Sequence, residues 1–297
     1  MITNIGFGDR NATVFGHVVT PQGKSYRFSN GRTESNWTLS SDRLRMEIGS
    51  STLDLHAPLY RVQVNKRKVR VDLRFRPDEA FVPARSLSRT GYTLETLALG
   101  APVEGTLWVK GMEEPLVVKG LLTATHSWMT EAGSTLVLRR IEFFSFDENM
   151  ALYGIDLTTP RGERARWVLV KPDGTRGYSV EQSDLALQGE DKTTNTPGYT
   201  VPQTLDLKSE HIEGQIHVAP VVLRADPLAD LPPPVRFLVS VLLDFRPQRV
   251  WASSSFSLSF RPTNGSVPVH RQGTGVTAVT FLNPLPADAR FATQHSE

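Results

Sequence analysis

The sequence contains no cysteine among its 297 residues. Disulfide bonds, thiolate nucleophiles, thiolate-bound zinc and iron–sulfur clusters are therefore excluded. A strong excess of charge of one sign is also absent, because 33 lysine and arginine residues stand against 31 aspartate and glutamate residues. This near balance lacks the electrostatic footprint of a nucleic-acid-binding protein, and we expect no nucleic-acid partner.

Long apolar runs are missing as well. The first ten residues contain neither a basic segment nor an apolar one, so no signal peptide is indicated. The longest apolar stretch, residues 235–245, is interrupted by Arg236, Ser240 and Asp244 and is too short to span a bilayer. We therefore expect a cytoplasmic protein with at most peripheral membrane contact.

Familiar catalytic and metal-binding motifs are scarce. There is no glycine-rich phosphate loop and no Gly-x-Ser-x-Gly elbow. The seven histidines are scattered, and His211 and His217, six residues apart, either share a strand face or lie across a turn. We therefore expect no metal and no cofactor.

The sequence is rich in short segments that alternate between apolar and polar residues. Residues 69–76 are the clearest example, and this period of two is typical of half-buried strands. Turn signals such as Asn30-Gly31 and Pro172-Asp173-Gly174 separate the segments. The basic cluster at residues 66–68 either contacts anionic groups or belongs to a solvated outer strand face. The pattern predicts an all-β protein.

Similar features recur in the same order in the two halves of the chain. Residues 14–24 match residues 152–163, which aligns Gly16 with Gly154. A strand ending at Pro77 is echoed by one ending at Pro220, and a hairpin at residues 111–120 by one at 265–273. We infer an internal duplication, with one antiparallel barrel formed by residues 1–132 and a second by residues 133–297.

Residues 232–246 break the strand pattern. Pro232, Pro233 and Pro234 precede a segment that is apolar nearly all round, and Pro247 follows it. This arrangement favours a short helix that is buried or covers a barrel mouth. A buried central strand is the alternative.

His126 and Trp128 form the first candidate site. They are two residues apart, so their side chains share one face of a strand. An imidazole beside an indole, at the junction of the two barrels, can serve as an acid–base group under an aromatic wall. The alternative is a packed pair that stabilises the domain interface.

A second candidate group lies on the next predicted strands. Arg140, Glu142, Phe144 and Phe146 share one face of residues 138–146. The pair of charges is either a structural ion pair or a tuned carboxylate in an apolar pocket. Tyr153 follows on another strand and points away from Asp156 on the opposite face.

These blocks resemble a known superfamily. It contains the carotenoid 1,2-hydratases (hydroxyneurosporene synthases), the AttH-type proteins, the Svf1-type survival factors and the fungal lipocalin-like Diels–Alderases. The resemblance extends over residues 10–285 and implies two tandem lipocalin-like barrels. The residues that carry it are Val103-Glu104-Gly105, Gly111, Gly120 through His126-Ser127-Trp128, Tyr199-Thr200-Val201-Pro202, Arg246-Pro247 and Trp251.

The resemblance also implies roles for individual residues. The hydratases of this superfamily use the His, the Trp, and a downstream Tyr with an Asp two positions beyond it, which correspond here to His126, Trp128 and Tyr153. Thr125 replaces the Asp that usually precedes the His, and Ile155 occupies the position of the downstream Asp. Asp156 is one residue out of step, which argues against carotenoid hydration itself.

Three hypotheses follow for the function. The first is a cofactor-independent enzyme that hydrates, dehydrates, isomerises or cyclises an apolar isoprenoid or polyketide-like substrate. Its pocket lies at the domain junction, with His126, Trp128 and Tyr153 as catalytic residues. The second is a non-catalytic carrier of a hydrophobic small molecule, and the third is a scaffold without a ligand. The residues expected to bind the ligand are Glu142, Phe144, Phe146, Asp156 and Trp251.

Overall fold

The described part of the chain folds into β-strands that pair in antiparallel sheets. The computed structural model describes residues 2–8, 11–20, 24–33, 36–76, 85–87, 92–129, 136–147, 149–172, 178–181, 186–188, 199–209, 211–229, 233–242, 246–261 and 267–284. Strands dominate these residues, so the all-β class predicted from the alternating pattern is confirmed.

The chain divides into two compact units. The first consists of Met1–Glu79 and Gly100–Ala124, and the second of Ala80–Leu99 and Thr125–Glu297. Two long strands, β10 (Tyr92–Val109) and β11 (Leu116–Met129), therefore contribute residues to both units. The boundary predicted at residues 132 and 133 lies outside the described residues, and it stays a prediction.

The strands that precede β12 form two sheets. A three-stranded antiparallel sheet has the order β1-β2-β3, and a second sheet has the order β11-β10-β8-β7-β6-β5-β4 with β9 paired to β10. The remaining bounds are β1 (Ile2–Gly8), β2 (Asn11–Val19), β3 (Ser25–Thr33), β4 (Trp37–Leu39), β5 (Arg45–Ile48), β6 (Ser51–Asp54), β7 (Tyr60–Asn65), β8 (Val69–Phe75) and β9 (Arg85–Leu87). In β8 the apolar positions are buried and Arg70 and Arg74 are exposed, as its alternation predicts.

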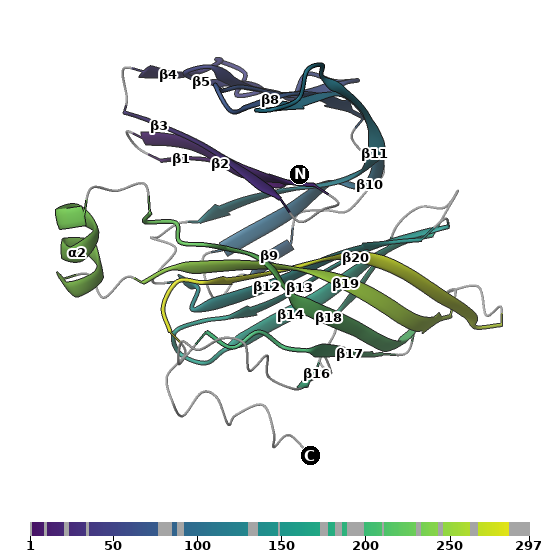
Figure 1. Ribbon diagram of the computed structural model, residues 1–297. Coiled ribbons are helices and arrows are strands. Elements are labelled where there is room, and N and C mark those ends of the chain that lie inside the picture. The colour runs from purple at the N-terminus through teal and green to yellow at the C-terminus, as the bar shows by residue number, and fades with distance from the viewer. Residues whose placement is uncertain are drawn as a thin grey trace. The chain divides into compact units, whose positions relative to one another are not determined.

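The second unit contains a nine-stranded sheet, coloured from teal to yellow in Figure 1. Its order is β15-β14-β13-β12-β20-β19-β18-β17-β16. Its strands are β12 (Arg139–Phe146), β13 (Met150–Thr158), β14 (Arg164–Pro172), β15 (Tyr178–Glu181), β16 (Ala186–Gln188), β17 (Thr204–Lys208), β18 (Ile212–Ala225), β19 (Gln248–Phe260) and β20 (Val269–Phe281).

Both faces of this sheet are buried around β12 and β13. One apolar cluster includes Phe143 and Leu152, and the other includes Tyr153 and Ile155. Every residue of β13 is consequently buried. Gly154 is required in its place, because a Cβ atom there would lie 1.9 Å from the Phe143 ring. The two faces of the sheet therefore provide two separate buried environments.

The strand orders support the internal duplication. Each half begins with three consecutive antiparallel strands, β1-β2-β3 in the first and β12-β13-β14 in the second. Gly16 lies on β2 and Gly154 on β13. Later, β8 pairs with β10 as β18 pairs with β19, and the long hairpins β10–β11 and β19–β20 follow. The equivalence of the two glycines on superposition stays a prediction.

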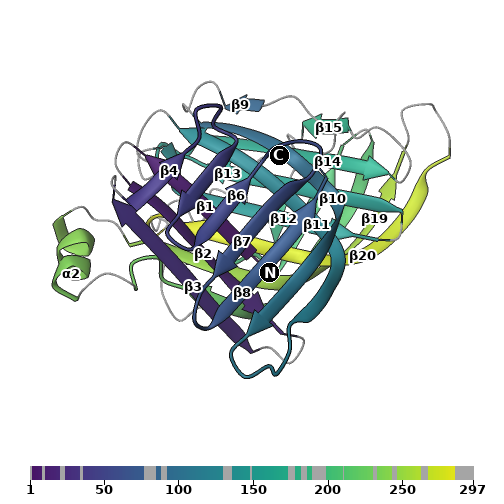
Figure 2. The ribbon, with the colours of Figure 1, turned by 90° about the horizontal axis from the view of Figure 1, so that it is seen from above.

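The predicted helix is present, but the alternative in which it is buried is wrong. Helix α2 (Pro233–Leu242) begins within the proline run, and Figures 1 and 2 show it projecting from the nine-stranded sheet. Val235, Leu238 and Val241 are exposed, and Phe237 is 68% exposed. Apolar composition alone therefore did not indicate which side of the helix is covered. No helix in the described part of the chain is long and apolar enough to cross a membrane.

Two local predictions are also wrong. Asn30 and Gly31 do not form a turn but lie inside β3, where the buried Asn30 side chain donates a hydrogen bond to the Ile48 carbonyl at 2.6 Å. The strand predicted to end at Pro220 continues to Ala225. Proline has no N–H to donate, and the pairing with β19 shifts register between Val218 and Val221 instead of ending.

Candidate functional site

The pairing of four strands places the predicted polar residues on one face of the nine-stranded sheet. Glu142 of β12 lies opposite Ile155 of β13, and Phe144 opposite Tyr153. On the other side of β12, register through β20 brings Trp251 of β19 level with Glu142. The face predicted from the period of two is therefore assembled from residues more than a hundred positions apart, such as Glu142 and Trp251.

A connected polar network occupies this face. The Tyr153 hydroxyl donates to Glu142 Oε1 at 3.0 Å, and Arg140 Nε lies 3.0 Å from Glu142 Oε2. Arg140 Nη1 in turn donates to the Tyr92 hydroxyl at 2.9 Å. Tyr92, Glu142 and Tyr153 are all buried. We call these four residues, Tyr92, Arg140, Glu142 and Tyr153, the Glu142 network.

Burial and charge set the protonation of the network. Burial raises the pKa of Tyr153 well above its usual value, and the Glu142 charge raises it further. Burial acts to lower the pKa of Arg140, but the Glu142 carboxylate and the two tyrosine hydroxyls outweigh it and raise that pKa. The phenol of Tyr153 therefore stays protonated and donates, while Arg140 stays charged.

Aromatic side chains surround the network. The Phe144 ring stacks on Tyr153 with centroids 5.0 Å apart. Phe144 and Phe146 pack partly buried against the same apolar cluster. Trp251 is buried, and the Arg249 guanidinium lies 5.8 Å from its ring centroid. Burial and the nearby Arg140 charge lower the pKa of Arg249 to about 10. The network is thus a small group of polar side chains surrounded by apolar ones.

His126 and Trp128 lie elsewhere, as a pair on β11. Their ring centroids are 5.1 Å apart with a tilt of 41°, and both side chains are exposed. Among the contacts of the described residues, neither forms a hydrogen bond or ion pair with Glu142 or Tyr153. The structure therefore brings Glu142, Phe144 and Tyr153 together but leaves the His126 pair outside that network.

Asp156 lies on the opposite face of the same sheet. It is fully buried, and its Oδ2 atom is 2.5 Å from Arg164 Nη2 and 3.3 Å from Arg166 Nε. It faces away from Tyr153, as the sequence spacing predicts. Asp156 and the Glu142 network therefore belong to different environments.

Tyr92 and its role were not predicted from the sequence. It stands at the start of β10, 48 positions from Arg140, and nothing in its local pattern indicates that partner. Arg140 was identified only as the neighbour of Glu142. Only the folded topology brings Tyr92 and Arg140 together.

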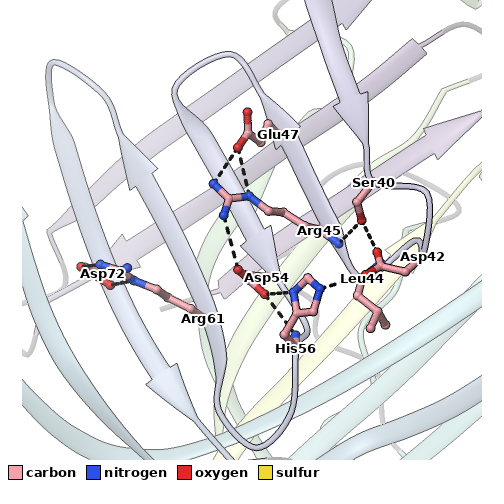
Figure 3. Close-up of polar contacts among 9 residues, drawn as sticks. All are labelled: Ser40, Asp42, Leu44, Arg45, Glu47, Asp54, His56, Arg61 and Asp72. Carbon is pink, nitrogen blue, oxygen red and sulfur yellow. Dashed lines mark hydrogen bonds and ion pairs between the residues drawn. The ribbon is translucent and has the colours of Figure 1, made fainter.

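A contrasting polar cluster lies in the first unit, on the loops that flank β5 and β6 (Figure 3). His56 Nδ1 lies 2.6 Å from Asp54 Oδ1, and His56 Nε2 lies 3.0 Å from Asp42 Oδ2. The Ser40 hydroxyl donates a short hydrogen bond to Asp42. Because both imidazole nitrogens face carboxylates, His56 has no nitrogen left for a substrate. We call Ser40, Asp42, Asp54 and His56 the His56 cluster.

The electrostatics of the His56 cluster favour a charged imidazole. Hydrogen bonds from Ser40, from the Leu44 amide and from His56 lower the pKa of Asp42 to about 2. Hydrogen bonds to Asp54 and Asp42 raise the pKa of His56. These shifts suit an ion pair that ties two loops together rather than a catalytic base.

A pocket of about 300 Å³ is present beside α2. None of the residues of the Glu142 network lines it. Its lining residues are Tyr199, Asp226, Leu228, Arg236, Ser240, Arg246, Pro247 and Gln248. Across the described segments of the chain, no group of three or more His, Asp or Glu side chains is placed to hold a metal.

Comparisons with known proteins identify the fold. No family profile matches the sequence, and no curated protein matches it. Solved structures do match: an AttH-type protein from Nitrosomonas europaea has a TM-score of 0.61 at 12% identity, with 92% of this chain and 82% of that chain covered. Kievitone hydratase from Nectria haematococca has a TM-score of 0.61 at 13% identity, with 95% and 83% covered.

A further match is CghA in complex with Sch210972, with a TM-score of 0.53 at 10% identity and coverage of 93% and 85%. The chain therefore has the lipocalin-like fold predicted from its resemblance to this superfamily. At these identities the likeness concerns the fold.

Proposed function

We propose that the protein is a cofactor-independent enzyme acting on an apolar isoprenoid or polyketide-like substrate that carries oxygen. The observation that supports this proposal is the Glu142 network, a set of buried hydrogen-bonded groups within an apolar cluster. Buried charged networks contribute little net stability compared with apolar packing, so a chemical role accounts for them better than a structural one. Structural neighbours that include a hydratase support the same class of substrate.

The arrangement suggests a division of roles. The Tyr92 hydroxyl accepts a hydrogen bond from the Arg140 cation, and no described residue accepts its own proton. That proton is available to polarise a carbonyl or hydroxyl group of a substrate. Glu142, which accepts a hydrogen bond from the Tyr153 hydroxyl, is the proposed base. A neutral phenol that donates a hydrogen bond suits polarisation of a substrate oxygen, and this role favours isomerisation or cyclisation over protonation of an unactivated alkene.

His126, Trp128, Phe146 and Trp251 complete the proposed site. They remain predicted members, with His126 as a further hydrogen-bonding group and the aromatic rings as walls for the substrate. Asp156 is proposed to act separately, on the other face of the sheet.

The test combines ligand identification with turnover. The purified protein is extracted with organic solvent for mass spectrometry, and it is then incubated in D2O with the extracted compound and with kievitone. We expect a product that separates from the added compound on chromatography, whether it is an isomer of equal mass, differs in mass or carries deuterium, and Tyr92→Phe and Tyr153→Phe should each lower the rate about 100-fold while binding persists. Tyr60→Phe, which removes a hydroxyl in the first unit, is the matched control.

A non-catalytic carrier is the second candidate, supported by the same apolar surroundings of Tyr153. In that case the compound is recovered bound but unchanged, and neither tyrosine substitution alters its fate. Binding of no apolar compound by the wild-type protein would contradict both candidates.

A further inference from the structure

Arg139 is a buried cation of the nine-stranded sheet. It is the first residue of β12 and is 8% exposed. Its Nε atom is buried and makes no hydrogen bond, and no described residue forms an ion pair with its guanidinium. Burial, with repulsion from Arg164 and Arg166, outweighs the attraction of Asp156 and lowers its pKa to about 10, so Arg139 remains charged at neutral pH. A buried unpaired charge is strongly unfavourable, and its presence calls for an explanation.

The residues around Arg139 carry an excess of positive charge. Cross-strand pairing places Thr158 of β13 directly between Arg139 and Arg164 of β14, and Asp156 beside Arg166 in the next row. Three arginines therefore share one face of the sheet with a single carboxylate, and Arg164 and Arg166 already lie within ion-pair distance of it. One further anion of one or two charges would balance the cluster.

Unused hydrogen-bonding groups face the same place. The Thr158 hydroxyl is buried and has no hydrogen-bond partner. Arg139 and Arg164 flank it from strands that lie one step away on either side, so their long side chains can converge above it. The side chain of Arg164 is 21% exposed, so the cluster is reachable from solvent.

We propose that Arg139, Thr158 and Arg164 form a binding site for a small oxyanion, either a phosphate group or a carboxylate. Guanidinium groups donate paired hydrogen bonds that match both oxyanions, and the Thr158 hydroxyl supplies another donor. The site lies on the face of the sheet opposite the Glu142 network, with Asp156 as its internal counter-charge. It is independent of the proposed catalytic function.

The test measures the melting temperature of the full-length protein in inorganic phosphate, in acetate and in chloride at equal ionic strength. Phosphate or acetate should raise the midpoint of the wild-type protein by roughly 5–10 °C at concentrations about 100-fold above Kd. The anion that acts identifies the ligand class. Arg139→Met should remove the response, while Arg224→Met, at an exposed position of β18, should retain it.

The unliganded variants separate binding from structure. Arg139→Met should melt in chloride at the same temperature as the wild type or higher, because it removes a buried unpaired charge. Arg139→Lys keeps the charge without the paired donors and should weaken binding about 10- to 100-fold by calorimetry. If Arg139→Met does not fold, the Arg139→Lys variant tests the proposed anion site on its own. The proposal is overturned if neither anion exceeds chloride for the wild type, or if both Arg139 variants respond as the wild type does.

Discussion

The Glu142 network and the His56 cluster combine the same kinds of groups in opposite surroundings. In the His56 cluster the side chains of His56 and Asp42 are 48% and 47% exposed, whereas those of Arg140 and Glu142 are 19% and 10% exposed. Water screens the first set and not the second, so removal of one partner has very different consequences. The comparison shows that burial, more than the number of ion pairs, determines what a charge contributes here.

The largest effect is expected where a buried charge loses its partner. Glu142→Leu leaves the Arg140 cation in an apolar environment and should lower the free energy of unfolding by about 3–5 kcal/mol. Urea denaturation of the variant measures this loss. The double substitution of Arg140→Met with Glu142→Leu removes both charges and should recover most of the stability. A loss below about 1 kcal/mol for Glu142→Leu would show that this network is as well solvated as the His56 cluster.

A smaller effect is expected from the neutral end of the network. Tyr153→Phe removes one hydrogen bond to a charged acceptor but leaves the Arg140–Glu142 ion pair in place. The free energy of unfolding should fall by about 1–3 kcal/mol, measured by the same urea titration. A loss of the size expected for Glu142→Leu would mean that the hydroxyl, and not the ion pair, holds the network together.

The two clusters also differ in how far sequence could predict them. Arg140, Glu142 and Phe144 were placed on one face correctly, because a strand fixes the direction of alternate side chains within a few residues. The same rule placed Tyr153 and Asp156 on opposite faces. Side-chain direction along a strand is a local property, and the sequence contains it.

Long-range partners could not be predicted in this way. Tyr92 meets Arg140 only through the topology, and Arg139 and Arg164 flank Thr158 only because three strands align in register. Helix α2 shows a related limit. Its apolar residues and flanking prolines predicted a helix correctly, but its exposure depends on what the rest of the chain covers. The superfamily resemblance predicted the fold, because the motif blocks that carry it are spread over residues 10–285.

The smallest effect is a pH dependence of the His56 cluster. The pKa of His56 is raised in the folded protein, so its contribution to stability is complete below the unfolded value, about 6.5, and is lost as the pH rises through the folded value. The pKa of Asp42 is lowered to about 2, so its contribution is present above an unfolded value of about 3.9 and is lost as the pH falls toward 2.

The His56 cluster should therefore stabilise the protein most between about pH 4 and pH 6.5. The difference in melting temperature between the wild type and His56→Gln should be small, greatest in this window, and should vanish at higher pH. An NMR titration of the imidazole protons measures the folded pKa directly. If His56 titrates at or below the value of an unstructured peptide, its two carboxylate contacts do not persist in solution. The His56 cluster would then differ from the Glu142 network in structural order as well as in burial.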